Sequence, residues 1–535
     1  MLEKSHSQNF MRGAFLVTLA QFVTKIMGAV HRPFGQWLIG DRGLGLAAGP
    51  SYAYYVMLAI SSIGLNVAIS RLVAERLALS DLRGARRVYK VASAMLIVSG
   101  VAFALLFGLG AKWLARLVEM PEAWPGFLAL APAVLFVSLL CGYRGLYQGM
   151  QQMQPSAVSQ VVEQIVRVGL SIPLMAVLAR ISLPLGAAGF NAGNTVGTFS
   201  AVLYFAWLTY RTKATDGWTT VAPGVQSWEH ESVTTLMGKI LAIALPLSLI
   251  GAAQPLMGFL DTKIVTNRLT MLGMSGQVHD AVAWLGNAST FRDLPTILTN
   301  ALYVSLVPAI AESFATGRLD QARYRASTAF RITFLIAVPA TVGLAVGAQD
   351  VYGILLTGPG WIVMEPLAWS AFFLMIQYVS SGTLQGMGRI MVSVRNLVAG
   401  LLVKVALTYW WTGLPALGVR GAAYATSVGI GVTAGLNLWA LWRHLGLKVD
   451  LKGDVLRPAL ASAVMGLSIW LASPVVHHFI HFNRLAALIV VGFAGAIYAV
   501  AIFVLGGVTK ADLGLIPGVS AGMLDKLSRY RLLRN

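Results

Sequence analysis

The sequence predicts an all-α, polytopic membrane protein with about fourteen transmembrane helices, arranged as two pseudo-symmetric six-helix lobes plus two extra C-terminal helices. Three observations predict this fold: the composition, the length of the apolar segments and an internal repeat. Apolar residues make up 57% of the 535 residues, and charged residues make up only 11%. A soluble domain carries about a quarter charged residues. This chain therefore cannot cover itself with a water-facing surface.

Apolar segments of about 20 residues, which cross the hydrocarbon core as helices, recur along the whole chain. The expected spans are 11–31, 51–70, 89–110, 126–148, 156–179, 186–209, 238–266, 291–311, 329–348, 362–384, 394–412, 417–441, 456–475 and 485–505. The first is expected to be a transmembrane helix and not a signal peptide, because it is long, contains Lys25 and lacks a small-residue cleavage site. The sole cysteine, Cys141, lies inside a span, so no intramolecular disulfide is expected.

A degenerate repeat links the two halves of the chain. The segment 144–168 returns about 237 residues later, in a segment that begins near Thr383. The matching positions are Gln148–Gly149–Met150 with Gln385–Gly386–Met387, Ser156 with Ser393, Val161 with Val398, Arg167 with Lys404, and Gly186–Ala187–Ala188 with Gly421–Ala422–Ala423. Matches at nearly one offset, each between two apolar spans, indicate a duplicated multi-helix unit. Many transporters are built from two such repeats.

The repeat and the polar segments predict five regions. We expect an N-lobe at 1–210, a cytoplasmic linker at 211–237, a C-lobe at 238–445, two further helices at 446–508 and a basic amphipathic tail at 509–535. The linker is polar and contains the turn pairs Asp216–Gly217 and Pro223–Gly224. In the tail, apolar residues recur at helical spacing opposite basic ones, which suits either a helix on an anionic inner leaflet or a plain solvated tail.

The net charge of +19, from 40 Lys and Arg against 21 Asp and Glu, is unevenly distributed. Alternate loops hold basic clusters such as Arg83, Arg86 and Arg87, whereas the loops between them hold single cations such as Arg180. By the positive-inside rule, both termini are expected in the cytoplasm. The basic residues are spread over many short loops, which does not fit a nucleic-acid-binding surface.

Charges inside the spans are candidate functional sites, because an ionisable side chain in lipid is costly unless it faces water or a partner. Six basic residues are expected to line a substrate-binding cavity: Lys25, His31, Arg32, Arg144, Arg292 and Lys404. Lys25 is the foremost of them, since no acid lies within four residues on its own helix. A basic chamber suits an anionic cargo such as a phosphate or pyrophosphate.

Four other charges are expected to be structural or coupling residues: Glu163, Arg167, Asp261 and Lys263. Glu163 and Arg167 are four residues apart and share a helix face, so they are predicted to pair. No Walker A or HExxH motif occurs, and we expect no catalytic residue, cofactor or metal. His477, His478 and His481 are expected to form an interfacial belt, with no acidic ligand nearby.

The chain resembles the multidrug/oligosaccharidyl-lipid/polysaccharide (MOP) flippase superfamily, and within it the Gram-positive branch of stage V sporulation protein B and lipid II flippases. The residues that carry the resemblance are Thr24–Gly28, Arg32–Pro33, Ile39–Gly45, Ile69–Glu75, Arg144–Val168 and Leu306–Glu312.

The resemblance implies a flippase of the bacterial plasma membrane that carries an undecaprenyl-pyrophosphate-linked saccharide to the outer leaflet. It also implies membrane lipids and cell-wall synthesis proteins as partners, and a monomer. Relatives hold the pyrophosphate with cations in helices 1, 2 and 8. Lys25 matches the first position and His31–Arg32 the second, whereas Leu58 stands where a helix 2 arginine would be, and Arg292 lies three residues before Pro295 instead of five.

Several functions stay open from the sequence. The cargo could be a peptidoglycan precursor, a spore-cortex precursor or another polyprenyl-linked glycan. The main competing function is a cation-coupled multidrug or metabolite exporter of the same fold, although the charge within the spans is mainly basic. A membrane enzyme that transfers glycans and a scaffold protein without transport activity also stay open.

Overall fold

The computed structural model describes residues 2–213, 231–447, 450–480 and 482–508, and every regular element within them is a helix. The predicted tail at 509–535 and most of the predicted linker lie outside the described residues. The chain divides into two compact units, residues 1–283 and 284–535, and each is described below by itself.

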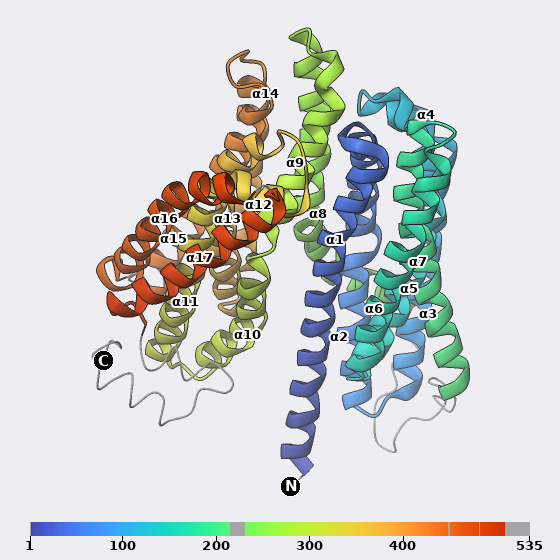
Figure 1. Cartoon of the computed structure of the whole chain (residues 1–535). Helices are drawn as coiled ribbons and strands as arrows, with labels where there is room; N and C mark the ends of the chain where they lie inside the picture. Colours follow the sequence, from blue (N-terminus) through green and yellow to red (C-terminus); the bar gives the residue numbers. More distant parts are fainter. Residues whose placement is uncertain (1, 214–230, 448–449, 481, 509–535) are drawn as a thin grey trace. The chain divides into compact units, whose positions relative to one another are not determined.

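Unit 1 contains α1 to α8 and the first part of α9. Their bounds are α1 Leu2–Leu58, α2 Gly64–Ala78, α3 Leu82–Leu109, α4 Ala111–Leu117, α5 Trp124–Gly149, α6 Met153–Leu178, α7 Leu183–Thr212, α8 Val233–Met271 and α9 Val278–Asp293. The helices α3, α5 and α7 run side by side (Figure 1). Tyr147 of α5 and Phe205 of α7 are fully buried in the apolar core between these helices.

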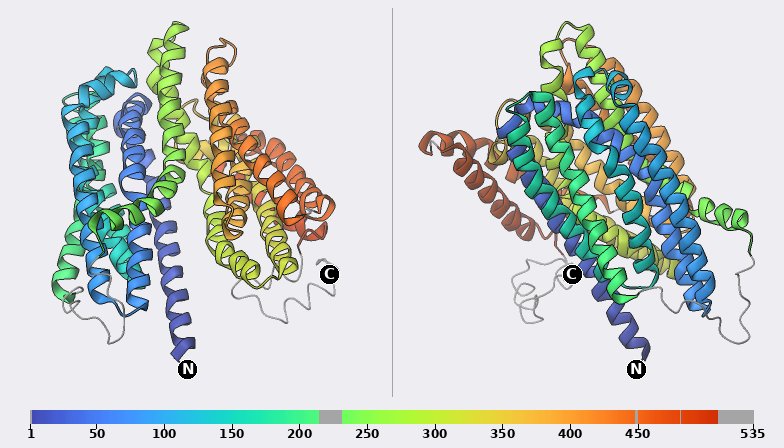
Figure 2. Two further views of the ribbon diagram at one scale, coloured as in Figure 1. Left: turned by 180° about the vertical axis from the view of Figure 1, so that it is seen from behind. Right: turned by 90° about the vertical axis from the view of Figure 1, so that its right-hand side faces the viewer.

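Unit 2 contains the rest of α9 and the helices α10 to α17. Their bounds are α10 Thr296–Ala315, α11 Leu319–Val346, α12 Ala348–Leu355, α13 Trp361–Gly386, α14 Ile390–Thr412, α15 Val419–Leu445, α16 Arg457–Phe479 and α17 Asn483–Val504. Phe330, Val379 and Leu441 join α11, α13 and α15 in an apolar core of this unit. The last two helices, drawn in orange and red, lie against each other (Figure 2).

The helix content confirms the all-α membrane fold but not the count of fourteen spans. Eleven helices in the described residues are long and apolar enough to cross a membrane. The expected spans 11–31 and 51–70 are joined in one long helical segment. The helices α7 and α15, which contain spans 186–209 and 417–441, are not among the eleven; both are rich in Gly, Asn and Thr, which lowers their hydropathy.

The two N-terminal spans are joined through a kink at Gly40, where φ is 66° and ψ is 179° inside α1. Glycine adopts a positive φ without the steric cost that a Cβ brings. The polar pair Asp41 and Arg42 follows the kink directly, but the apolar residues around it, Ile39, Leu44 and Ala47, are buried. Because these apolar residues pack inside unit 1, the chain stays helical where the sequence predicted a connection.

The repeat is visible in how α5 of unit 1 and α13 of unit 2 pack on their neighbours. A Cβ added at Gly149 would lie 2.9 Å from Val73 of α2, and one at Gly386 would lie 2.7 Å from Ile310 of α10. Both partners in the second contact lie about 237 residues after those in the first, the offset of the sequence repeat. The same two-helix contact therefore occurs once in each unit.

A second contact repeats at the predicted pair Arg167 and Lys404. A Cβ at Gly197 of α7 would lie 2.9 Å from the Arg167 Cβ, and one at Gly429 of α15 would lie 2.5 Å from the Lys404 Cβ. Each glycine lets two helix backbones approach at the base of a cationic side chain. Arg167 and Lys404 thus occupy equivalent places in their units.

The register of the following helices differs from the sequence alignment. Gly189 packs against Leu174 and Met175, and Gly421 packs against the equivalent Trp411 and Thr412. Gly421 therefore corresponds to Gly189 and not to Gly186. The reason is that α14 ends at Thr412, whereas α6 continues past the equivalent position, Met175, to Leu178.

These contacts predict that Gly197→Ala and Gly429→Ala each destabilise the protein by about 1–3 kcal/mol, because the added methyl meets backbone atoms that cannot move aside. The measurement is the thermal unfolding midpoint of the purified protein. Gly169→Ala and Gly435→Ala are matched controls on α6 and α15, where an added Cβ meets nothing within 4 Å. Equal midpoints for all four variants would contradict the packing described.

Candidate functional site

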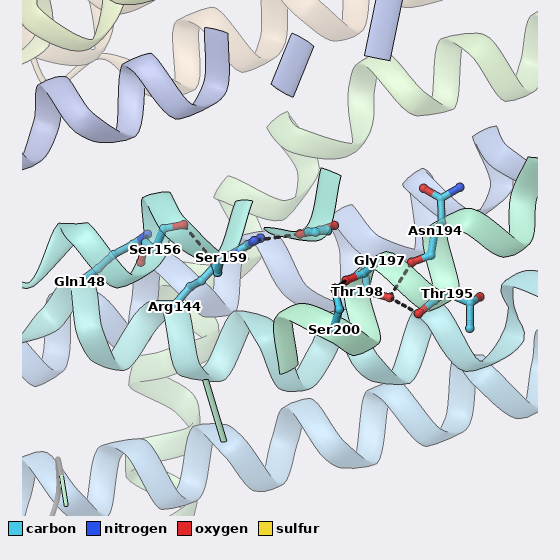
Figure 3. A network of polar contacts seen from close by, with 10 residues as sticks. Arg144, Gln148, Ser156, Ser159, Asn194, Thr195, Gly197, Thr198 and Ser200 are labelled. Carbon is cyan, nitrogen blue, oxygen red and sulfur yellow. Dashed lines mark hydrogen bonds and ion pairs between the residues drawn. The ribbon is translucent and has the colours of Figure 1, made fainter. Parts of the chain in front are cut away.

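The charges of unit 1 come together along α5 and α6, next to α1. Arg144 of α5 donates from Nη2 to Glu163 Oε2 of α6 at 2.8 Å and from Nε to Ser159 Oγ at 3.0 Å. Figure 3 shows Arg144 and Ser159 pointing toward each other, with Gln148 and Ser156 one turn away. Both charged side chains are mostly buried, with exposures of 16% for Arg144 and 25% for Glu163. Arg144 thus has a counterion inside unit 1.

Glu163 and Arg167, which the sequence predicts to pair with each other, each have another partner in the structure. Glu163 makes its ion pair with Arg144, and Arg167 donates from Nη2 to the Tyr55 hydroxyl of α1 at 3.2 Å. Sequence spacing on one helix could not reveal these partners, because both come from other helices. Tyr55 carried no sequence signal, since it lies 112 residues before Arg167.

His31 lies inside the packing of α1 against α6 and α7. Its ring stacks on Phe190 with centroids 4.5 Å apart, and its Nε2 lies 2.5 Å from Ser171 Oγ. Only 2% of the residue is exposed. The ring therefore packs α1 against α6 and α7.

Lys25 and Arg32 lie on α1 like His31, but both are more exposed than His31. Lys25 is exposed and Arg32 is partly exposed. Between them, Gly28 packs on Gln164 of α6, where an added Cβ would lie 3.6 Å from Nε2. This contact and the one between His31 and Ser171 align the Lys25–Arg32 segment with the stretch of α6 that carries Arg167.

The two cationic candidates of unit 2 are buried. Arg292 of α9 is 8% exposed and lies 2.7 Å from the neighbouring carboxylate of Asp293. Lys404 of α14 is 2% exposed and packs against Gly429. In unit 1, Asp261 and Lys263 of α8 are both partly buried, on either side of Thr262, which packs near Gly49 of α1.

Unit 2 has an uncharged network at the place of the Arg144–Glu163 pair, which the sequence did not reveal. Ser381 and Asn396 stand at the positions equivalent to Arg144 and Ser159. Asn437 Nδ2 donates to Ser381 Oγ at 3.1 Å, and Asn396 Nδ2 donates to Asn437 Oδ1 at 2.8 Å. The two repeats therefore share their packing but differ in charge at this point.

The histidines near the end of α16 have an acidic neighbour that the sequence did not predict. Asp350 of α12, 4% exposed, lies with Oδ1 2.7 Å from His477 Nε2. The two residues are 127 positions apart, so folding alone brings them together. His481 lies outside the described residues. Within those residues, no group of three or more His, Cys, Asp or Glu side chains is placed to hold a metal ion.

Comparisons with known sequences give full-length similarities. The chain is 27% identical to stage V sporulation protein B of Bacillus subtilis (strain 168) over 528 residues, which cover 95% of this chain and 98% of the relative. It is 26% identical to the lipid II flippase MurJ of the same organism over 561 residues, which cover 98% of both chains.

Solved structures show the same fold at lower sequence identity. The lipid II flippase MurJ in an inward closed conformation matches with a TM-score of 0.69 and 14% identity, over 92% of this chain and 98% of its own. An inward-facing multidrug resistance MATE family transporter of the MOP superfamily matches with a TM-score of 0.65 and 15% identity, over 79% of this chain and 98% of its own.

The sequence profile of the family described as polysaccharide biosynthesis protein matches residues 10–314, more than half of the chain. Together with the full-length relatives, this match confirms the resemblance to polysaccharide and lipid II flippase proteins that the sequence motifs suggested, and the protein is a multi-pass membrane protein. The chain belongs to the polysaccharide biosynthesis protein family.

Proposed function

We propose that the protein is a flippase that moves an undecaprenyl-pyrophosphate-linked glycan from the inner to the outer leaflet by alternating access with a basic central cavity. Lipid II and related cell-wall, spore-cortex or polysaccharide precursors are the cargo class. Two relatives support this class: one is named a stage V sporulation protein and the other a lipid II flippase.

The observation that carries the proposal is the cationic segment of α1. Lys25 is exposed within a helix long and apolar enough to span the membrane. An ammonium at such a position needs water or an anionic partner. A pyrophosphate that leaves water needs cationic donors to replace its lost hydration, and Lys25 with Arg32 can supply them.

A second observation fits a cargo with a long polyprenyl chain. A groove of about 520 Å³ lies between α16 and α17 in unit 2 and is lined by apolar side chains that include Leu471, Val475, Ile489 and Phe493. A flipped lipid keeps its tail in the apolar layer while its head group crosses, so an apolar groove on the protein suits it.

The competing function is a cation-coupled multidrug or metabolite exporter, which the structural likeness to a MATE transporter favours. A cationic drug needs a carboxylate that is not already neutralised. Glu163 does not meet this need, since it is paired with Arg144 at 2.8 Å. This pairing favours the lipid-linked glycan.

The direct test uses purified protein in liposomes that contain labelled lipid II. The proposal predicts faster transbilayer movement of lipid II than in protein-free liposomes. Unchanged lipid movement together with transport of a cationic dye would instead establish the exporter.

The proposed direction of transport depends on orientation, which reporter fusions measure. A reporter after Asn535 and one inserted near Gly217 should both lie in the cytoplasm, because basic residues gather in the loops of that side. A reporter near Gly276, between α8 and α9, should lie outside. Cytoplasmic activity of the Gly276 fusion would refute the proposed topology.

A further inference from the structure

Arg167 and Tyr55 lie next to each other and carry hydrogen-bond donors that the protein does not fully use. Arg167 Nη2 donates to the Tyr55 hydroxyl oxygen at 3.2 Å, which leaves the phenol proton available to a second acceptor. The Nε of Arg167 is buried and has no hydrogen-bond partner among the described residues. A guanidinium has five N–H donors in a planar fork that fits carboxylate and phosphate oxygens.

The nearest acid on α6 makes its direct ion pair with another residue. Glu163, one turn before Arg167, accepts from Arg144 at 2.8 Å. Arg167 makes no ion pair within the part of the chain that the structure describes. Of the two arginines beside Glu163, Arg144 therefore makes the direct ion pair, whereas Arg167 feels Glu163 only at longer range and keeps hydrogen-bond donors for a ligand.

The position of Arg167 places it next to the cationic segment of α1. On α6 it lies between Gln164, which packs on Gly28, and Ser171, which lies 2.5 Å from His31. Gly197 of α7 packs on its Cα and Cβ and holds the start of the side chain in place. The equivalent Lys404 of unit 2 is only 2% exposed, whereas Arg167 is partly exposed and can reach a ligand.

We infer that Arg167 and Tyr55 form an oxyanion site for a phosphate group of the lipid-linked cargo, in unit 1, beside Lys25 and Arg32. The inference rests on the proposed function, because it needs a cargo that carries phosphate. It exchanges the two roles expected from the sequence: Arg144 is a structural residue with Glu163, and Arg167 binds cargo. Tyr55 acts as a second donor and fixes the guanidinium plane.

The test measures binding of undecaprenyl pyrophosphate, presented in detergent micelles, to the purified full chain. Arg167→Gln should weaken binding by about tenfold or more, since a hydrogen-bonded charge is lost. Tyr55→Phe should weaken it by a smaller factor, and Arg167→Lys should give an intermediate loss because charge survives without the planar fork. Arg180→Gln, which removes an exposed cation just beyond the end of α6, is the matched control and should bind like the wild type.

Undecaprenol and inorganic pyrophosphate distinguish failure of the Arg167 site from failure of the proposed function. If the wild type binds undecaprenol as tightly as undecaprenyl pyrophosphate, head-group recognition and the proposed function both fail. If the wild type prefers the pyrophosphate and Arg167→Gln binds it equally well, only the Arg167 site fails. Competition by inorganic pyrophosphate at concentrations equal to the lipid would assign the site to a free anion and overturn the lipid cargo. Arg167→Lys and Tyr55→Phe keep the test valid should Arg167→Gln not fold.

Discussion

Lys25→Ala should reduce flipping of lipid II to the level of protein-free liposomes while the protein remains in the membrane at normal abundance. Lys25 is exposed on α1, so removing its side chain leaves no cavity in the core of unit 1. The substitution instead weakens binding of the cargo, because the pyrophosphate loses a charge-assisted hydrogen bond. Such a contact contributes about 1.5–3 kcal/mol, which corresponds to about a 10- to 150-fold change in rate.

Lys25→Arg separates charge from geometry at the same position. Charge survives in this variant but reach and donor arrangement change, so partial flipping is expected. The measurement is the initial rate of transbilayer movement per reconstituted molecule. Wild-type flipping by Lys25→Ala would show that the cationic segment of α1 does not bind the cargo, even though the family assignment would stand.

Glu163→Gln should lower the abundance of the protein more than it lowers flipping per molecule. It removes the counterion of Arg144, whose side chain is only 16% exposed. Breaking a fully buried pair costs about 3–5 kcal/mol. The partial exposure of Glu163 reduces the expected loss of stability to about 1–3 kcal/mol. Abundance in the membrane and the thermal midpoint of the purified protein check this expectation.

The second repeat supplies a rescue for this variant. Ser381 stands in unit 2 where Arg144 stands in unit 1, inside an uncharged hydrogen-bond network. Adding Arg144→Ser to Glu163→Gln removes the uncompensated charge and should restore much of the lost stability. If the double variant is less stable than Glu163→Gln alone, Arg144 has a role beyond pairing with Glu163.

The sequence predicts the helical membrane fold and the duplication because both leave local signals. Long apolar segments show the spans, and the glycine pair Gly149 and Gly386 recurs at the offset at which the structure repeats its contacts. The helical connection through Gly40 could not be predicted in this way, because the polar residues that follow it, Asp41 and Arg42, are typical of a loop between two spans.

The partners of the charged residues could not be predicted, since each comes from a distant helix. Same-face spacing favoured Glu163 with Arg167, but Arg144 on α5 reaches the carboxylate at 2.8 Å. In the same way, the spacing of the histidines gave no indication that Asp350 lies beside His477. The sequence thus identifies which residues carry charge in the membrane, and only packing decides which of those charges are compensated.

We propose that this protein flips lipids by recognising a pyrophosphate head group. The most direct measurement compares transbilayer movement of labelled lipid II with that of a polyprenol-linked saccharide that has no phosphate, in the same proteoliposomes. Wild-type protein should accelerate lipid II and leave the neutral lipid at the protein-free rate. Equal acceleration of both lipids, or of neither, would contradict it.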